Sequence, residues 1–142
     1  MSPQSGLLRD HSGTFNANLM SAVATVASLE YLKQEPPYER LVRSTANLTQ
    51  GLKELAEEDS IPLRLQGVAG AFHASIATTD VEVHDFRDLA RLDNDAYLRL
   101  VDRMIASGIW LSGRGIGYVS TAHDEDEVGI TLEGCREAFA AA

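Results

Sequence analysis

The spacing of apolar residues changes several times along the chain, and each spacing predicts one kind of element. Residues 19–32 read LMSAVATVASLEYL, with apolar positions three and four apart, which predicts a helix rich in small side chains. Asn16 or Asn18 can cap its first turn through a side-chain oxygen, and Pro36 and Pro37 end it. Because small side chains let neighbouring backbones come close, we expect this helix to have contacts on more than one side.

A second helix is predicted from about Pro37 to Ser60. Residues spaced four and three apart form one amphipathic face there, namely Leu41, Thr45, Leu48, Leu52 and Leu55. The period then falls to two, which predicts two short strands with one buried face. The alternating residues of these strands are Leu63 and Leu65, then Phe72, Ala74 and Ile76.

The acidic stretch 77–92 has no clear period, and we expect it to be a surface excursion. A third helix follows it, capped by Asp93 or Asp95, with its apolar face at Tyr97, Val101, Met104 and Ile105. Gly108 stands where a residue in the left-handed conformation ends a helix.

The last third of the chain predicts two more strands, IWLS at 109–112 and GYVST at 117–121, joined by the glycine-rich SGRGIG. Asp124 and Glu127 then form a pair typical of a capping box. The final helix follows this pair, and its apolar face is Val128, Leu132, Cys135 and Phe139.

The predicted order is therefore α-α-β-β-α-β-β-α. Runs of the same element and short hairpins indicate an α+β fold, with a small antiparallel sheet and helices packed on one face. We expect three parts along the chain. These are a polar loop and linker over residues 1–18, a connector helix over 19–35, and a compact α+β domain over 36–142.

Composition narrows the possible partners. With 142 residues, 44% hydrophobic and 23% charged, the chain has the make-up of one folded domain. A formal net charge of −9 without a lysine or arginine cluster argues against nucleic acid or an anionic membrane as a partner. The single cysteine, Cys135, permits no internal disulfide, and its apolar neighbours predict a buried helix residue. The sequence has no signal-like start and no apolar run of membrane length, so we expect a cytoplasmic protein.

Two short motifs are candidates for chemistry. Gly13 and Thr14 precede the first helix and could present N–H groups and a hydroxyl to an anion, although a plain capped helix start fits the same pattern. Arg114 stands between glycines at the hairpin tip, where it suits a carboxylate ligand or is simply an exposed arginine. The chain has only two lysines, Lys33 and Lys53, and neither has the surroundings of an amine activated for Schiff-base chemistry.

The histidines do not form a recognisable site. There are four of them, and they share no metal-ligand spacing: His11, His73, His84 and His123. No Ser-His-Asp arrangement can be argued from the order of residues either. We therefore predict no metal site and no catalytic residue in this chain.

Two longer stretches, HSGTFNANLMSAVATVASLEYL and GIWLSGRGIGYVSTAHDEDEVGITLEGCREAF, carry a family resemblance. The first resembles the segment that opens the C-terminal part of class III pyridoxal-phosphate-dependent aminotransferases, and the second resembles that family's closing hairpin and last helix. The STAHDEDE portion is most similar to glutamate-1-semialdehyde 2,1-aminomutase and its near relatives. The hairpin here reads SGRGIGY, where the aminomutase has a Phe-Glu-Ala-Gly-Phe-like sequence.

The resemblance implies the C-terminal domain of a fold-type-I enzyme that works as a homodimer or with an aminotransferase large domain. In the family, the Gly-Thr pair reaches the cofactor phosphate of the neighbouring subunit, so Gly13 and Thr14 are implied to bind pyridoxal phosphate. The family's Schiff-base lysine lies upstream, in the large domain. An arginine in the hairpin is closer to relatives that transaminate amino acids bearing a carboxylate, which implies that Arg114 binds a substrate carboxylate.

We therefore expect a truncated or separately encoded fragment of an aminotransferase or aminomutase, acting on a small amino acid only within a complete enzyme. Alone, it is expected to bind pyridoxal phosphate weakly or not at all. Two alternatives stay open. One is a non-catalytic module that pairs with intact aminotransferase subunits, and the other is a remnant that folds, self-associates through the first helix and binds nothing.

Overall fold

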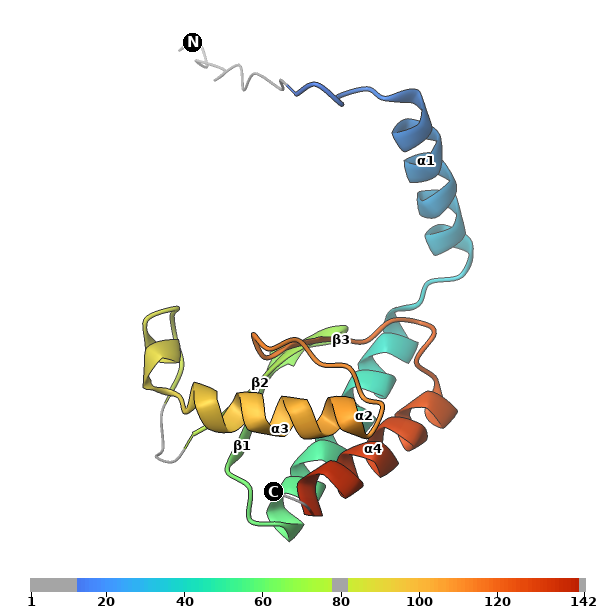
Figure 1. Cartoon of the computed structure of the whole chain (residues 1–142). Coiled ribbons are helices and arrows are strands. Elements are labelled where there is room, and N and C mark those ends of the chain that lie inside the picture. Colours follow the sequence, from blue (N-terminus) through green and yellow to red (C-terminus); the bar gives the residue numbers. More distant parts are fainter. Residues whose placement is uncertain (1–12, 78–81, 141–142) are drawn as a thin grey trace, which may run out of the picture. The chain divides into compact units, whose positions relative to one another are not determined.

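The computed structural model describes residues 13–77 and 82–140 of the chain (Figure 1). The chain divides into two compact units, residues 1–36 and 37–142. Within the described residues, the first unit holds one helix. The second holds three α-helices, a short 3-10 helix and a three-stranded sheet.

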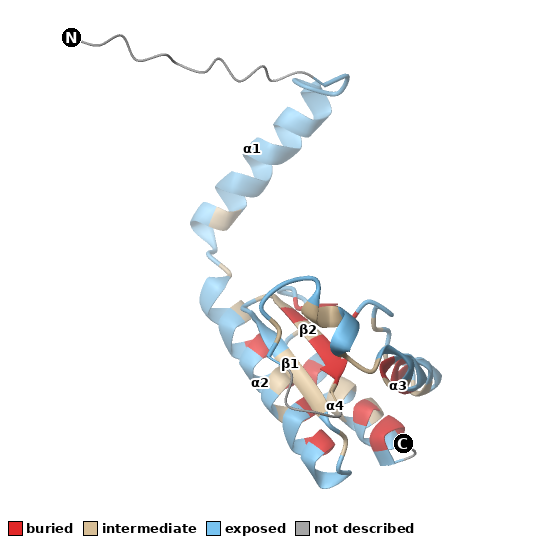
Figure 2. Ribbon diagram, turned by 90° about the vertical axis from the view of Figure 1, so that its left-hand side faces the viewer, coloured by how far each residue is buried: buried red, intermediate tan, exposed pale blue. Residues whose placement is uncertain are grey.

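The helix of the first unit is α1 (Leu19–Gln34), and Asn18 caps it as predicted. The side-chain oxygen of Asn18 accepts a hydrogen bond from the backbone N–H of Ser21 at 3.1 Å, which satisfies a free donor of the first turn. None of the sixteen residues of α1 is buried (Figure 2). Large apolar side chains along it are more than half exposed, including Leu19, Met20, Val23, Val26 and Leu29.

In the second unit, α2 (Tyr38–Glu58) buries the face that its sequence predicts. The buried residues of that face are Thr45, Leu48, Leu52 and Leu55. The last helix, α4 (Glu125–Ala140), packs against α2. A Cβ on Gly51 would collide with the side chain of Leu132, so the missing side chain at Gly51 lets the two helices approach closely.

The sheet is antiparallel, with strand order β1-β2-β3. It consists of β1 (Leu63–Val68), β2 (Ala71–Ile76) and β3 (Ile116–Tyr118). The helix α2 packs against β1, the helix α3 (Asn94–Ala106) packs against β2, and α4 packs against both helices. The predicted alternation in β2 is confirmed, because its core-facing residues are buried: Phe72, Ala74 and Ile76. The α+β class is therefore confirmed.

The predicted order of elements holds with one difference, since residues 109–112 form no strand of the sheet. The backbone N–H of Ile109 donates to the carbonyl of Met104 at 2.8 Å, and the hydroxyl of Tyr97 donates to the carbonyl of Ser112 at 3.1 Å. Both ends of this segment are thus bonded to α3 (Asn94–Ala106) rather than to a neighbouring strand. The β3 strand pairs with β2 alone.

The ends of the helices follow the predicted signals. Asp93 caps α3 by accepting a hydrogen bond from the N–H of Ala96 at 2.9 Å, and Gly108 has a φ of +83° just beyond the helix. Before α4, the N–H of Asp124 donates to the carboxylate of Glu127 at 3.3 Å, one half of a capping box.

Across the described residues, the helices are too short or too polar to traverse a bilayer.

Candidate functional site

A cavity of about 710 Å³ opens at one edge of β2 in the second unit. On this edge β3 pairs with β2 only as far as His73, so residues 74–76 of β2 have a neighbouring strand on the β1 side alone. Its wall is formed by residues 73–76 of β2, the turn at 113–116, the segment 86–94 and Tyr97 of α3. Mostly apolar walls with a few convergent polar groups are typical of sites that bind small molecules.

The turn that carries Arg114 is fixed by hydrogen bonds around it. The N–H of Gly115 donates to the carbonyl of Ser112 at 3.0 Å, and the N–H of Arg114 donates to the hydroxyl of Ser112 at 3.1 Å. The turn is then joined to β2, because the N–H of Ala74 donates to the carbonyl of Gly115 at 2.7 Å. Arg114 is exposed on the cavity wall and makes no ion pair with any described residue, so its guanidinium is available to an anion.

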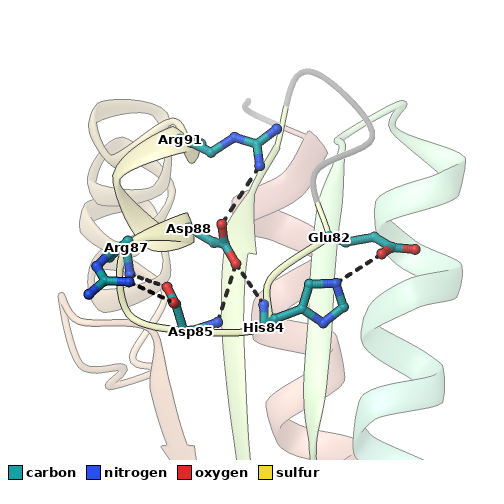
Figure 3. A network of polar contacts seen from close by, with 6 residues as sticks. All are labelled: Glu82, His84, Asp85, Arg87, Asp88 and Arg91. Atoms are coloured by element: carbon teal, nitrogen blue, oxygen red, sulfur yellow. Dashed lines mark hydrogen bonds and ion pairs between the residues drawn. The ribbon is translucent and has the colours of Figure 1, made fainter.

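Acidic and basic side chains stabilise the segment that forms the opposite wall (Figure 3). The carboxylate of Asp88 accepts hydrogen bonds from the backbone N–H groups of His84 and Asp85, at 2.9 and 3.2 Å, and lies 3.7 Å from the guanidinium of Arg91. These two N–H bonds lower the pKa of Asp88. The bonds hold the start of the 3-10 helix η1 (Asp88–Arg91), which presents Leu89 to the cavity.

Two polar residues of β2, His73 and Ser75, line the cavity beside the core-facing residues. His73 is half-buried, and this burial lowers the pKa of its imidazole. The positive charge of Arg64 lowers the pKa further, whereas a hydrogen bond with the backbone of Arg114 raises it. Ser75 is only 5% exposed. Within the described part of the chain, its hydroxyl is the buried side-chain polar group without a hydrogen-bond partner.

Tyr97 closes the cavity from the helix side. It is buried, which raises the pKa of its phenol to about 12, so it stays a neutral hydrogen-bond donor at physiological pH. Because its hydroxyl is bonded to the carbonyl of Ser112, it fixes the start of the turn that carries Arg114. We therefore regard Tyr97 as a positioning residue.

The other predicted motif, Gly13 and Thr14, lies in the first unit. The carbonyl of Gly13 accepts a hydrogen bond from the N–H of Asn16 at 2.9 Å, so the pair belongs to a turn just ahead of α1. Thr14 is exposed, and neither its N–H nor its hydroxyl bonds to another described residue. The first turn of α1 has no acidic side chain, so the positive end of the helix dipole is not neutralised there.

The remaining candidates do not converge. Lys33 and Lys53 are both exposed, on α1 and α2 respectively. His11 lies outside the described residues, and His123 accepts the N–H of Ser120 through Nδ1, which makes it part of a local turn. No group of three or more possible metal ligands occurs in the described ranges. Cys135 is fully buried, as predicted, and burial raises the pKa of its thiol to about 12.

Ser75, Phe86 and Tyr97 belong to the cavity but were not identified from the sequence. Ser75 occupies the polar phase of an alternating strand, which predicts a solvated face. Ser75 is buried all the same, and the alternation of the strand alone does not predict this. Tyr97 was predicted only as an apolar helix residue.

Comparisons with known proteins identify the fold. No family model matches the sequence. Among solved structures, the chain resembles an omega-transaminase from Sphaerobacter thermophilus with a TM-score of 0.75 at 22% identity, over 94% of this chain and 31% of the transaminase. It also resembles the β-phenylalanine aminotransferase from Variovorax paradoxus with a TM-score of 0.75 at 26% identity, over 96% of this chain and 31% of that protein.

A third similar structure is an amine transaminase from an uncultivated Pseudomonas species with pyridoxal phosphate bound. It matches with a TM-score of 0.73 at 20% identity, over 94% of this chain and 30% of its own. The fold is therefore that of the C-terminal domain of transaminases. The chain spans about a third of the length of these proteins.

Proposed function

We propose that this chain serves as the C-terminal domain of a pyridoxal-phosphate-dependent class III aminotransferase. The observation that carries the proposal is the match of nearly the whole chain to transaminases, at TM-scores of 0.75. The cavity at the end of β2, with an arginine on its wall that pairs with no described residue, supports the same assignment. A fold alone does not imply an activity, so the argument depends on what these residues can do.

The cofactor phosphate is proposed to lie against Gly13 and Thr14. The residues fit this role, because Thr14 has an N–H and a hydroxyl that are not engaged by the described chain, ahead of a helix without acidic residues in its first turn. Gly13 has no side chain that would obstruct the approach. When bound, pyridoxal phosphate supplies an electron-withdrawing ring for amino-group transfer. The exposed amines of Lys33 and Lys53 do not fit its covalent attachment, which we assign to a separate large domain.

The substrate carboxylate is proposed to bind Arg114. A guanidinium can form two parallel hydrogen bonds with a carboxylate, which fixes orientation as well as charge. The tight turn and its bond to Ala74 hold the backbone of Arg114 in one place. This arginine favours a transaminase over an aminomutase, whereas the STAHDEDE stretch favours an enzyme close to glutamate-1-semialdehyde 2,1-aminomutase. We propose transamination of a carboxylate-bearing amino acid as the activity of the complete, dimeric enzyme.

The test is affinity purification of the tagged chain from its native cells, followed by three measurements on the recovered complex. We expect a second polypeptide or a longer form of the chain, bound pyridoxal phosphate, and transfer of an amino group from an amino acid to a keto acid. Thr14→Val should keep the complex but release the cofactor more readily. The matched control is Thr25→Val, because the Thr25 hydroxyl only bonds the Ser21 carbonyl within α1. A complex without pyridoxal phosphate would refute the proposal.

The non-catalytic alternative is favoured by one observation, the large apolar side chains that α1 carries, none of which is buried. A helix that is apolar on several sides needs a covering surface. A module or remnant would satisfy this need by self-association. Analytical sedimentation of the pure chain measures this self-association. Val23→Asp together with Val26→Asp should convert a dimer to a monomer. The control is Ser28→Asp, at a position that is already polar, which should leave the dimer intact. A dimer that forms while no cofactor-containing partner is recovered from cells would favour the alternative.

A further inference from the structure

The two faces of the sheet differ in what covers them. Phe72, Ala74 and Ile76 of β2 are buried in one core with residues of α2, α3 and α4. Because side chains alternate along a strand, the residues between them belong to the opposite face, which we call the outer face. The strand register places six residues of the outer face in two rows, namely Val68, Ala71 and Tyr118, then Gln66, His73 and Ile116.

The outer face carries large apolar side chains that are open to solvent. Val68 is 75% exposed and Tyr118 is 73% exposed, and both stand in the same row across the sheet. Trp110 is 87% exposed and lines a groove of about 520 Å³ together with Ile116 and Tyr118, so the apolar patch continues past β3. The solvated face of an antiparallel sheet is normally polar, whereas exposed apolar patches with aromatic residues are typical of protein interfaces.

The charges on the outer face have one sign. The chain has 21 acidic and 12 basic residues, yet none of the three strands of the described sheet carries an aspartate or a glutamate. Arg64 lies beside Gln66, because its guanidinium donates a hydrogen bond to the side-chain oxygen of Gln66 at 2.8 Å. Arg64 forms no ion pair with any described residue. A surface that supplies a carboxylate would therefore complement this arginine.

This charge pattern distinguishes between possible occupants of the outer face. A two-fold dimer brings the same patch of both copies together, so the face would meet a second Arg64 and no carboxylate from the strands. A formal net charge of −9 disfavours an anionic membrane or a nucleic acid. A different protein surface, apolar with a carboxylate at its rim, complements both the apolar patch and the arginine.

The matched structures indicate where such a surface occurs. The chain covers 31% of the omega-transaminase and 31% of the β-phenylalanine aminotransferase, so most of each protein lies outside this domain. We propose that the outer face docks on the large domain of the complete enzyme. Val68, Ile116 and Tyr118 pack against apolar side chains of that domain, and Arg64 pairs with one of its carboxylates. This inference rests on the proposed function, because that function supplies the large domain.

The first measurement is the reactivity of a cysteine placed on the outer face. Val68→Cys is labelled with a maleimide in the isolated chain and in the complex that the tagged chain recovers from its native cells, and mass spectrometry follows the labelled peptide. Labelling should slow about tenfold or more in the complex, because the core of an interface excludes water. The matched control is Ile130→Cys on α4, at a position that is 68% exposed, and its rate should be the same in both samples.

The second measurement identifies what lies against Arg64. Arg64→Lys keeps the charge and supplies an amine, which a carbodiimide joins directly to a carboxylate in contact with it. In the complex, we expect a cross-link from residue 64 to an aspartate or glutamate that lies outside these 142 residues. The matched control is Arg99→Lys, at an exposed position of α3, which should give no such cross-link.

Three results would overturn the inference. They are equal labelling of Val68→Cys in the isolated chain and in the complex, no cross-link from residue 64, or a cross-link from residue 64 to a second copy of this chain. Any of these results in a complex that holds pyridoxal phosphate would leave the proposed function intact. The proposed function would fail separately, by recovery of a complex without pyridoxal phosphate.

Discussion

The amide of Ala74 and the carbonyl of Gly115 share a hydrogen bond of 2.7 Å, and the Cα of Gly115 lies so close to β2 that a side chain there would collide with the Ala74 carbonyl oxygen. Gly115 also has a φ of +81°, in the left-handed region that favours glycine. This contact is how the Arg114 turn is joined to the sheet.

Gly115→Ala is therefore expected to destabilise the protein. The substitution adds backbone strain to a collision with β2, and we expect the free energy of unfolding to fall by about 2 kcal/mol or more. Urea denaturation followed by circular dichroism measures the change. The control is Gly113→Ala in the same turn, where a Cβ meets only the flexible end of Leu98 and should cost much less. Equal effects of the two substitutions would contradict this account.

Two hydroxyl deletions should change stability in opposite directions. Ser75→Ala removes a buried hydroxyl without a partner and should raise the free energy of unfolding by about 1 kcal/mol. Thr45→Val should lower it by about 1–2 kcal/mol, because the Thr45 hydroxyl accepts the N–H of Gly70 at 2.9 Å and donates to the carbonyl of Leu41 at 2.7 Å. Both changes are measured by urea denaturation. A loss of stability in Ser75→Ala would show that its hydroxyl has a partner in the folded chain.

The lowered pKa of His73 predicts a pH dependence of stability. Burial makes protonation harder in the folded chain than in the unfolded one, whose histidine keeps the usual pKa of 6.5. The unfolded chain therefore binds more protons between the two pKa values, and the free energy of unfolding rises with pH through that window. The contribution of neutral His73 to the free energy of unfolding is complete above about pH 6.5 and is lost as the pH falls below that value. His73→Gln should reduce the slope between pH 5 and 7, and an unchanged slope would exclude His73 as its source.

Cys135 should not react in the native protein. Its thiol is fully buried and its pKa is raised to about 12, so the reactive thiolate is scarce and inaccessible. We expect Ellman's reagent at pH 8 to label it only as the protein unfolds in urea. Thr121→Cys in a Cys135→Ala background places a thiol at an exposed position and should label at once. Rapid labelling of the native wild type would show that the core around α4 opens readily.

Local signals predicted most of the fold because they are short-range. Asn18 and Asp93 cap helices within three residues of themselves, Gly108 ends α3, and the period of α2 identifies its buried face. The strand predicted at 109–112 is absent from the sheet. Its sequence pattern cannot show that the Tyr97 hydroxyl and the end of α3 form hydrogen bonds with its backbone.

The candidate site was predictable only in part. Arg114 was identified because glycines around an arginine are visible in the sequence, and the structure brings it to a cavity wall. The rest of that wall is contributed by segments far apart in the chain, such as β2 and residues 86–94. Two long-range interactions bring these segments together. One is the pairing of β3 with β2, and the other is the hydrogen bond from the N–H of Asp93 to the carbonyl of Ile76 at 2.9 Å.

The Arg114 turn closes on itself through Ser112, is held to α3 by the Tyr97 hydroxyl, and is joined to β2 by the bond between Ala74 and Gly115. The turn is held by its backbone, so the exposed side chain of Arg114 can be exchanged without disturbing these bonds. Replacing the arginine would change the charge of this cavity wall while the fold around it stayed the same. A domain built in this way can acquire a new cavity surface through one exchangeable position, with its core left unchanged.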